Sequence, residues 1–463
     1  MSRSSCEECL RKQLKIDELT EENQRLKQQV RYYKRKEQEG FFGSSTPSSK
    51  LPVKPNTPRA GTKKKPGAKP GHTGTGRSSC REEDADHVVQ VQPVVRAGVC
   101  PACGGTLIDK GSDNRTVLES RPVKVERVVY RLPRQYCPQC RRTFRARAPS
   151  VLPKSLYGNE ALASAAAMHY LHGVPMGRIC QQMGIEAGSL VEAFHRLARI
   201  FAAVPEKLIT QYRQAPVKHA DETGWRTNGA NGYVWLFATT DTSIFQFLKT
   251  RSGKVAREVF GKRRLPGTLV VDRYAAYNCA PCNIQHCYSH LARDVENLQK
   301  EFPESLEVAT FTSTMIAVLS QAMGLRSQKI PDEQFYQRAG ALKQEILQTV
   351  NTPAHHAGVR YIQDIFRDNR NRLYHWAADR RVPADNNLAE RALRPTVIAR
   401  KVSFGSQSDA GAKTRSVLMT VLHTLSNRGL DPAAQLKTAL DKLANNISQD
   451  PFPMLFSRDS PRN

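Results

Sequence analysis

The chain has 463 residues and carries 70 Lys and Arg against 43 Asp and Glu, a formal charge of +27 at pH 7. This excess of positive charge is typical of proteins that bind a polyanion such as DNA or RNA, although ribosomal association or a basic tail would also produce it. No apolar run approaches the roughly 18–20 residues that span a membrane, and the N-terminus has no apolar signal core, so we expect a cytoplasmic protein. The 11 cysteines therefore favour metal binding or free thiols over disulfides.

The first element expected is a helix within residues 6–39 that carries a heptad repeat. Its two seam positions are occupied in turn by Ile16, Leu19, Asn23, Leu26, Val30 and Tyr33. A buried Asn at a seam position fixes the register and favours two strands. The pattern predicts a short coiled coil that self-associates, or an amphipathic helix that packs on its own domain.

Residues 40–85 are rich in Gly, Ser, Pro and Lys and show no hydrophobic periodicity. This composition indicates a disordered basic linker. Its candidate DNA contacts are Lys63, Lys64, Lys65, Lys69 and Arg77. Basic residues interleaved with Pro and Gly can follow a phosphate backbone or lie in a minor groove, and a plain spacer is the alternative.

Two Cys-Pro-x-Cys pairs in residues 86–150 predict a zinc-binding module. The four thiols are those of Cys100, Cys103, Cys137 and Cys140. Four thiolates in two pairs match a closed tetrahedral Zn²⁺ site, which is structural because no position remains for water or substrate. Such a zinc contributes on the order of 10 kcal/mol to folding. The alternating segment at 123–132 predicts a strand, and Arg141 and Arg142 beside the second pair are candidate DNA contacts.

Residues 151–212 predict a helical segment. Two helices separated by a turn at Gly184 have the spacing of a helix-turn-helix that binds DNA. Two packed helices without any role in DNA binding fit the same pattern.

Residues 213–300 have the pattern of a sheet. Three strands, joined by turns at 228–232 and Asp241, precede a helix, and a buried strand then leads directly to Asp272. Asp221 lies at the end of the first strand. Three strands, a helix and a strand, with acids on the first and fourth strands, follow the order of a ribonuclease-H-like fold. Glu222 is expected on the opposite face because side chains alternate along a strand.

A third acid, Glu390, lies in a helix expected within residues 383–425. Asp385 is the candidate N-cap, and we expect Pro395 to end the helix, with a DNA-facing loop at 400–413. Carboxylates from two strands and a helix can converge, and Mg²⁺ prefers such oxygen ligands. A salt-bridged surface acid is the alternative for Glu390.

The interval between Asp272 and Glu390 is too long for one loop. Helical stretches at 304–324, 332–350 and 356–380 predict an all-α insertion over residues 301–382. Residues 426–463 are expected to form a C-terminal helix and tail. The sequence thus predicts a multidomain α/β protein, in which the mixed-sheet core with its insertion follows the coiled coil, the linker, the zinc module and the helical segment.

Three stretches carry a resemblance to a known family. These are VKHADETGWR at 217–226, VVDRYAAY at 270–277 and DNNLAERALRP at 385–395, the last followed by RKVSFGS. They resemble the insertion-sequence-66 family of bacterial DDE transposases, and the resemblance covers nearly the whole chain. It implies a ribonuclease-H-like core in which Asp221, Asp272 and Glu390 hold two Mg²⁺ ions, or Mn²⁺ in their place.

The resemblance also implies the reaction and the partners. Water activated by one metal ion would nick DNA, and the freed 3′-hydroxyl would then attack target DNA. Expected partners are double-stranded DNA of the transposon ends and target, a second or further copy of the chain, and accessory proteins of the same element, at the nucleoid. Arg391 and Arg394 would neutralise phosphates, or pair with acids of their own helix.

A Cys-x-x-His motif of this transposase group, Cys287 and His290, is expected to support the site together with Asn387. Cys279 and Cys282 lie just upstream and could complete a second zinc site with this motif. Two other functions stay open: a zinc-dependent DNA-binding protein without catalysis, and a ribonuclease-H-like nuclease that cuts without joining.

Overall fold

The computed structural model describes residues 125–456 continuously, together with residues 12, 15–27, 29–30, 83, 103 and 106. The chain divides into two compact units, of which one comprises residues 53–124 and the other the remainder. Most of the basic linker, with Lys63, Lys64, Lys65, Lys69 and Arg77, lies outside the described residues, as does Cys100. The account below therefore concerns residues 125–456 and the N-terminal helix, each by itself.

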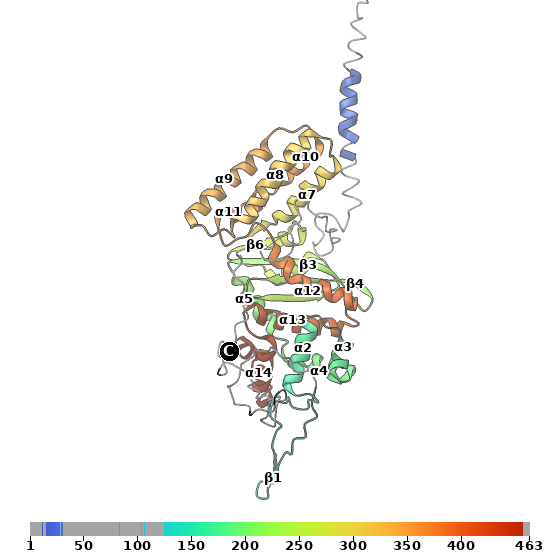
Figure 1. Ribbon diagram of the computed structural model, residues 1–463, viewed down its shortest axis with the longest axis vertical. Coiled ribbons are helices and arrows are strands. Elements are labelled where there is room, and N and C mark those ends of the chain that lie inside the picture. Colours follow the sequence, from blue (N-terminus) through green and yellow to red (C-terminus); the bar gives the residue numbers. More distant parts are fainter. Residues whose placement is uncertain are drawn as a thin grey trace, which may run out of the picture. The chain divides into compact units, whose positions relative to one another are not determined.

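A five-stranded mixed sheet organises the larger unit, with the strand order β5-β4-β3-β6-β7 (Figure 1). Its strands are β3 (Val217–Thr227), β4 (Ala230–Ala238), β5 (Ser243–Leu248), β6 (Thr268–Val271) and β7 (Asn283–His286). The first three form an antiparallel meander, and β6 and β7 extend the sheet in parallel beside β3. Helix α6 (Gly253–Phe260) connects β5 to β6. The mixed α/β character expected from the sequence is confirmed.

The turn between β3 and β4 shows why this hairpin forms. Asn228 and Gly229 both have positive φ angles, of 51° and 73°. A two-residue turn with both φ angles positive matches the twist of the strands it joins, and Asn and Gly reach that conformation at little cost. The local sequence therefore sets the register that brings Asp221 opposite Leu236.

Strand β5 forms one edge of the sheet and is covered by α13 (Asp409–Asn427). The hydroxyl of Thr420 accepts the backbone N–H of Phe245 at 3.0 Å, and that of Thr424 accepts the N–H of Ser243 at 3.2 Å. Side chains of a helix thus satisfy backbone groups that an exposed edge strand would offer to another chain.

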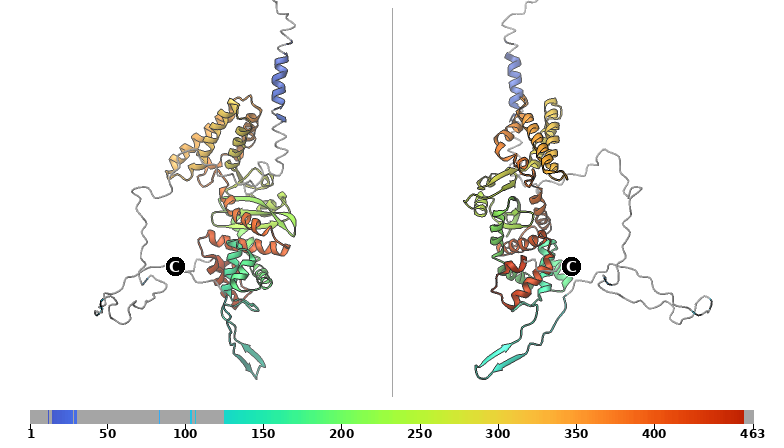
Figure 2. Two further views of the ribbon diagram at one scale, coloured as in Figure 1. Left: turned by 45° about the vertical axis from the view of Figure 1, so that its right-hand side comes forward. Right: turned by 90° about the vertical axis from the view of Figure 1, so that its left-hand side faces the viewer.

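The larger unit has two hydrophobic cores, and Figure 2 shows the sheet and the helical bundle that contribute to them. The larger core unites the sheet with α2 (Asn159–Ala166), α3 (Met176–Met183), α4 (Ala187–Ile200), α5 (Val204–Gln214), α12 (Asn387–Ser403), α13, α14 (Pro432–Asn445) and α15 (Pro451–Phe456). The smaller core lies within the helices that follow β7, namely α7 (Tyr288–Glu301), α8 (Leu306–Leu325), α9 (Asp332–Asn351), α10 (Ala357–Asp368) and α11 (His375–Ala378). The smaller core reaches the sheet through Val270 of β6.

Helix α8 corrects the expectation that no segment is apolar enough to span a membrane. It has 20 residues and a mean hydropathy of 1.4 over its most apolar window, which satisfies length and composition. Its buried side chains, among them Met315 and Leu319, belong to the smaller core, where α8 packs against α7 and α9. A core helix of this kind meets the same criteria as a membrane span.

Helix α12 does not end at Pro395 but continues to Ser403. A proline inside a helix removes one hydrogen bond and costs about 3 kcal/mol. Here Leu393, Thr396 and Ala399 are buried on the helix face that packs against β3 and β4, and their burial offsets that cost. The expected loop at 400–413 is consequently short, because α13 already begins at Asp409.

Two other stretches differ from expectation. The stretch at 356–380 is divided among α10, a short 3₁₀ helix (Arg370–Arg372) and α11. The described part of the strand expected at 123–132 has no regular structure, and the hairpin β1 (Arg134–Cys137) and β2 (Arg142–Arg145) follows it instead. As expected, helices α3 and α4 flank Gly184, whose φ of 67° allows the turn, and a role of this helix pair in DNA binding stays a prediction.

Candidate active site

Two of the three expected acids lie side by side on neighbouring parallel strands. His219 of β3 is opposite Val270 of β6; Asp221 follows two residues later within β3, and Asp272 comes directly after the last residue of β6, Val271. Both carboxyl groups are almost fully buried, at 3% and 2% exposure. The parallel register therefore brings two acidic side chains to the same level of the sheet.

The start of α12 is fixed to β3 by Asn386, a residue that the sequence analysis did not single out. Its Nδ2 donates to the carbonyl oxygen of Ala220 at 2.9 Å, and its Oδ1 lies 2.9 Å from Nδ1 of His219. Asn387, which was expected to support the site, donates its backbone N–H to Oδ1 of Asp385 at 3.0 Å. Asn386 therefore positions the first turn of α12, and with it Glu390.

The start of α7 is fixed at the same place. The backbone N–H of Cys287 donates to Val271 of β6, and that of Tyr288 donates to Ala384, both at 2.8 Å. The N–H of Asn386 donates to Sγ of Cys287 at 3.1 Å. The N-termini of two helices thus meet beside the acids, where their dipoles favour negative charge such as a phosphate group.

Unpartnered oxygen atoms mark this region as a site for a cation. Oδ2 of Asp221, Oδ2 of Asp272 and Oε1 of Glu390 are buried and have no hydrogen-bond partner among the described residues. Burial, and then the charges of Glu222, Asp272 and Glu390, raise the pKa of Asp221 well above its usual value. Burial and Glu222 raise the pKa of Asp272 in the same way. A divalent cation would satisfy these oxygens and relieve their repulsion, so the residues fit Mg²⁺.

Glu222 belongs to a different network, as its place on the other face suggested. Arg251 donates to its Oε1 from Nε at 3.0 Å, and the hydroxyl of Tyr277 donates to its Oε2 at 2.5 Å. The guanidinium of Arg251 also lies 3.9 Å from the ring centre of Tyr274. Arg251 and Tyr277 thus hold Glu222 beside the site, where its charge still acts on Asp221 and Asp272.

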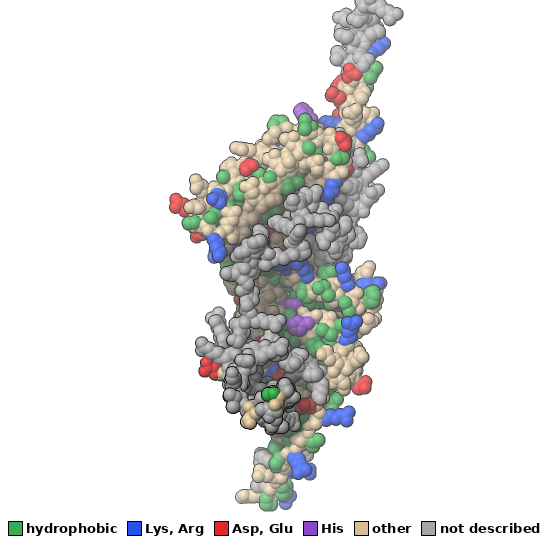
Figure 3. Space-filling model, viewed as in Figure 1, with side chains coloured by type: hydrophobic (Ala, Val, Ile, Leu, Met, Phe, Trp, Pro, Cys, Tyr) green, Lys and Arg blue, Asp and Glu red, His purple; other side chains and the backbone are tan. Residues whose placement is uncertain are grey.

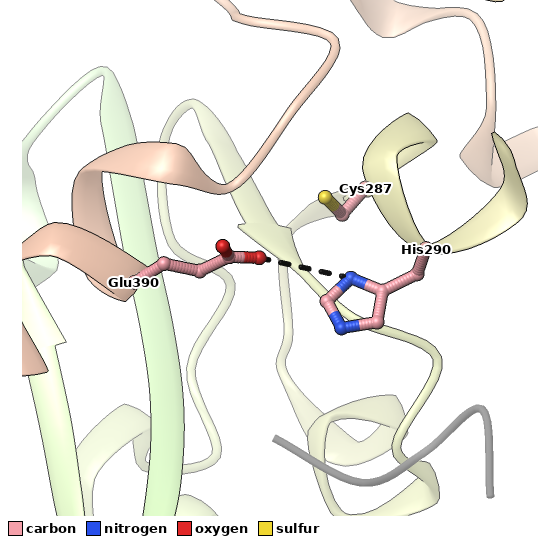
Figure 4. Close-up of side chains that lie close together, drawn as sticks. All are labelled: Cys287, His290 and Glu390. Carbon is pink, nitrogen blue, oxygen red and sulfur yellow. Dashed lines mark ion pairs between the residues drawn. The ribbon is translucent and has the colours of Figure 1, made fainter. Parts of the chain in front are cut away.

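Glu390 lies close to the Cys-x-x-His motif (Figure 4). Its Oε1 is 4.0 Å from Nδ1 of His290, and one ligand atom from each of Cys287, His290 and Glu390 lies within 4.8 Å of the others. Burial, Arg293 and Arg273 lower the pKa of His290 to about 3. The imidazole is therefore neutral at neutral pH, and its contact with Glu390 is no ion pair.

The buried thiol of Cys287 is protonated at neutral pH. Burial, followed by the charge of Glu390, raises its pKa to about 12. Cys279 and Cys282 do not join this motif, since among the described residues no metal-binding group includes them. The thiol of Cys279 instead lies 3.2 Å from the carbonyl oxygen of Ala276.

The two arginines expected near the site are exposed on α12. No carboxylate of the described residues lies within 4.0 Å of Arg391 or Arg394, so pairing with acids of their own helix is wrong as an alternative. Arg391 lines a cleft of about 1070 Å³ that also reaches His219. Three further arginines line this cleft, namely Arg326, Arg381 and Arg428.

The zinc module is described only in part. Cys103 and Cys140 are exposed and form no disulfide, and Cys137 ends strand β1. Arg141 lies in the turn before β2, with a positive φ of 53°, and Arg142 begins that strand. Because Cys100 lies outside the described residues, the zinc site stays a prediction.

The fold and this site define a mixed α/β protein with two buried aspartates at neighbouring strands and a partly buried glutamate on a helix. The model of a family described as "Transposase IS66 family" matches residues 154–414, more than half of the chain. The chain therefore belongs to the IS66 family of transposases, which are enzymes that handle DNA.

Two curated relatives come from Sinorhizobium fredii (strain NBRC 101917 / NGR234). The chain is 24% identical over 409 residues to the "Uncharacterized protein y4qI", covering 79% of this chain and 74% of the relative. It is 22% identical over 406 residues to the "Uncharacterized protein y4jD", covering 77% and 76% of the two chains.

Proposed function

We propose that this protein is a DDE transposase with a ribonuclease-H-like core, which binds the ends of its insertion sequence, cleaves them and joins them to target DNA. The observation that carries the proposal is the set of three buried, unpartnered carboxylate oxygens on Asp221, Asp272 and Glu390. They come from β3, the end of β6 and the first turn of α12. Oδ1 of Asp221 and of Asp272 each accept a backbone N–H, but among the described residues nothing satisfies the second oxygen of either acid, and a bound cation would.

In this proposal Asp221, Asp272 and Glu390 are the magnesium ligands. Two Mg²⁺ ions, or Mn²⁺, would supply Lewis acidity that activates the attacking oxygen and stabilises the leaving oxygen. The helix N-termini of α7 and α12 orient the scissile phosphate. Asn386 and Cys287 hold those two helices together, so they position Glu390 without touching the substrate.

Charge supports DNA as the partner. Figure 3 shows Lys and Arg side chains spread over the sheet region and the helical bundle rather than gathered in one patch. The arginine-lined cleft, which reaches His219 and Asp385, suits a phosphate backbone, and Arg391 and Arg394 follow Glu390 along α12. Helices α3 and α4, the basic linker and the zinc module with Arg141 and Arg142 would add contacts away from the site.

Self-association is proposed through the N-terminal helix, because joining requires two DNA ends to be held together. Residues 15–27 and 29–30 are helical, as the heptad repeat predicts. Ile16, Leu19, Leu26 and Val30 of its seam are 47–55% exposed, a stripe of apolar side chains that a second copy would cover.

The test is incubation of the purified protein with Mg²⁺ and labelled DNA that carries the element's own ends. Nicked and joined products with the wild type, and neither with Glu390→Gln, would support the proposal. Nicked products without joined ones would favour a nuclease, and binding without cleavage would favour a DNA-binding protein. The control is Glu296→Gln, the same substitution at a half-buried acid of α7 outside the cluster, which should react as the wild type does.

A further inference from the structure

The Cys-x-x-His motif offers more than support for the helix start. Both ring nitrogens of His290 are buried and have no hydrogen-bond partner among the described residues, although the side chain is only 4% exposed. A buried imidazole ordinarily satisfies at least one nitrogen. Its neighbours are Sγ of Cys287 and Oε1 of Glu390, and the latter is also unpartnered.

The spacing of these atoms is close to that of metal ligands. Bond lengths of about 2.0–2.3 Å around a tetrahedral Zn²⁺ place ligand atoms about 3.3–3.7 Å apart. The three ligand atoms lie within 4.8 Å of one another, and the pair His290 Nδ1 and Glu390 Oε1 is at 4.0 Å. Small side-chain rotations therefore suffice to form a site with three protein ligands and one open position.

The ligand types distinguish this group from the acids of β3 and β6. A thiolate and a neutral imidazole suit Zn²⁺, whereas Mg²⁺ prefers oxygen ligands. The N–H of Asn386 already donates to Sγ of Cys287 at 3.1 Å, the kind of contact that stabilises a metal-bound thiolate. The thiol proton would leave to solvent when the metal binds.

We infer that Cys287, His290 and Glu390 form a second site, for a thiophilic divalent cation such as Zn²⁺, which shares Glu390 with the proposed magnesium site. Among the described residues, the ligand atoms of Cys287, His290 and Glu390 all lie within 4.8 Å of one another. Asp221 and Asp272 form no such group with Glu390. Glu390 thus already leans toward α7. Zinc bound there would hold Glu390 away from the two aspartates and act as an inhibitor.

The existence of the site does not depend on the proposed function, but the competition with Mg²⁺ rests on it. The first experiment measures zinc per chain in the full-length protein after equilibration with Zn²⁺ and removal of unbound metal. The wild type should hold one zinc more than Cys287→Ser, in which the serine still accepts the N–H of Asn386. Equal zinc contents would overturn the inference.

A matched control uses the other cysteines of this region. Cys279→Ser removes a thiol that lies outside the group and should leave the zinc content at the wild-type value. Loss of one zinc in both serine variants would overturn this ligand set in favour of one that includes Cys279. Glu390→Gln keeps the volume of the third ligand and should weaken binding of the additional zinc at least tenfold, with thermal unfolding checking that each variant is folded.

The second experiment titrates Zn²⁺ at several concentrations of Mg²⁺ in the absence of DNA. The apparent Kd of the additional zinc should rise in proportion to Mg²⁺ once the magnesium site fills. If the apparent Kd of the additional zinc does not change with Mg²⁺, the zinc site is supported but the shared role of Glu390 is overturned. No additional zinc in a protein that still cleaves DNA would overturn the inference while the proposed function stands.

Discussion

The Asp272→Asn variant probes the acid cluster without any metal or DNA. Oδ1 of Asp272 accepts the N–H of Tyr274 at 2.9 Å, whereas Oδ2 is buried without a partner among the described residues. An unsatisfied buried polar group costs about 1–3 kcal/mol, and more when it is charged. Asparagine keeps the shape and the hydrogen bond but removes the charge. We expect the variant to gain about 1–2 kcal/mol in free energy of unfolding, or about 1–3 °C in Tm for a chain of this size.

The sign of the pH dependence follows from the raised pKa of Asp272. The folded protein binds this proton more tightly than the unfolded chain does. The contribution of Asp272 to stability is therefore largest at low pH, and it is lost as the pH rises through the raised pKa. The variant lacks this loss, so its advantage in metal-free buffer should be larger at about pH 8 than at about pH 5.

Thermal unfolding followed by circular dichroism measures both effects, in buffer without added divalent ions and then with Mg²⁺. Mg²⁺ should raise the Tm of the wild type and leave that of the variant unchanged. Asp294→Asn is the matched control, because Asp294 is paired with Arg273 and the same substitution there should lower the Tm. A Tm for Asp272→Asn below that of the wild type at both pH values would refute the reasoning.

Three further outcomes are expected. Arg251→Met leaves Glu222 buried without its cation and should cost about 3–5 kcal/mol in urea unfolding, a loss that Glu222→Gln on the same background should partly restore. Asn386→Ala should cost about 1–3 kcal/mol by the same titration, and a comparable loss in Asn387→Ala would contradict the assigned role of Asn386. Arg391→Gln should weaken binding to all DNA duplexes alike and reduce the slope of log Kd against log salt concentration by about 1. Fluorescence anisotropy measures this slope, and an unchanged slope would argue against a phosphate contact.

The sheet could be predicted because its signals are local. The turn at 228–232, the fully buried strand β6 and the acid directly after it are all visible within short windows of sequence. Helix α12 shows where local signals fail. Pro395 is a strong stop signal, and only the burial of Leu393 and Ala399 against the sheet overrides it.

The contacts that position the site could not be predicted in the same way. His219 and Asn386 are separated by 167 positions in sequence, and nothing in either segment alone indicates that their side chains meet. The signals for both residues stood within the quoted stretches VKHADETGWR and DNNLAERALRP, one beside each acid. Helical spacing from Glu390 points to Asn387 as the supporting residue. The residue that contacts β3 is instead Asn386, which precedes the helix.

The hydrogen bond between the N–H of Tyr288 and the carbonyl oxygen of Ala384 brings the start and the end of the helical bundle together beside the sheet. The two ends of the segment that contains α8 to α11 are therefore joined, and Gln285 of β7 also hydrogen-bonds to Leu373 and Trp376 near its C-terminal end. Such a segment can be lengthened, shortened or replaced by another whose ends are adjacent, and the position of Glu390 stays the same. The distance in sequence between the second and third acids is therefore free to vary, and a search for related sites should leave that interval unrestricted.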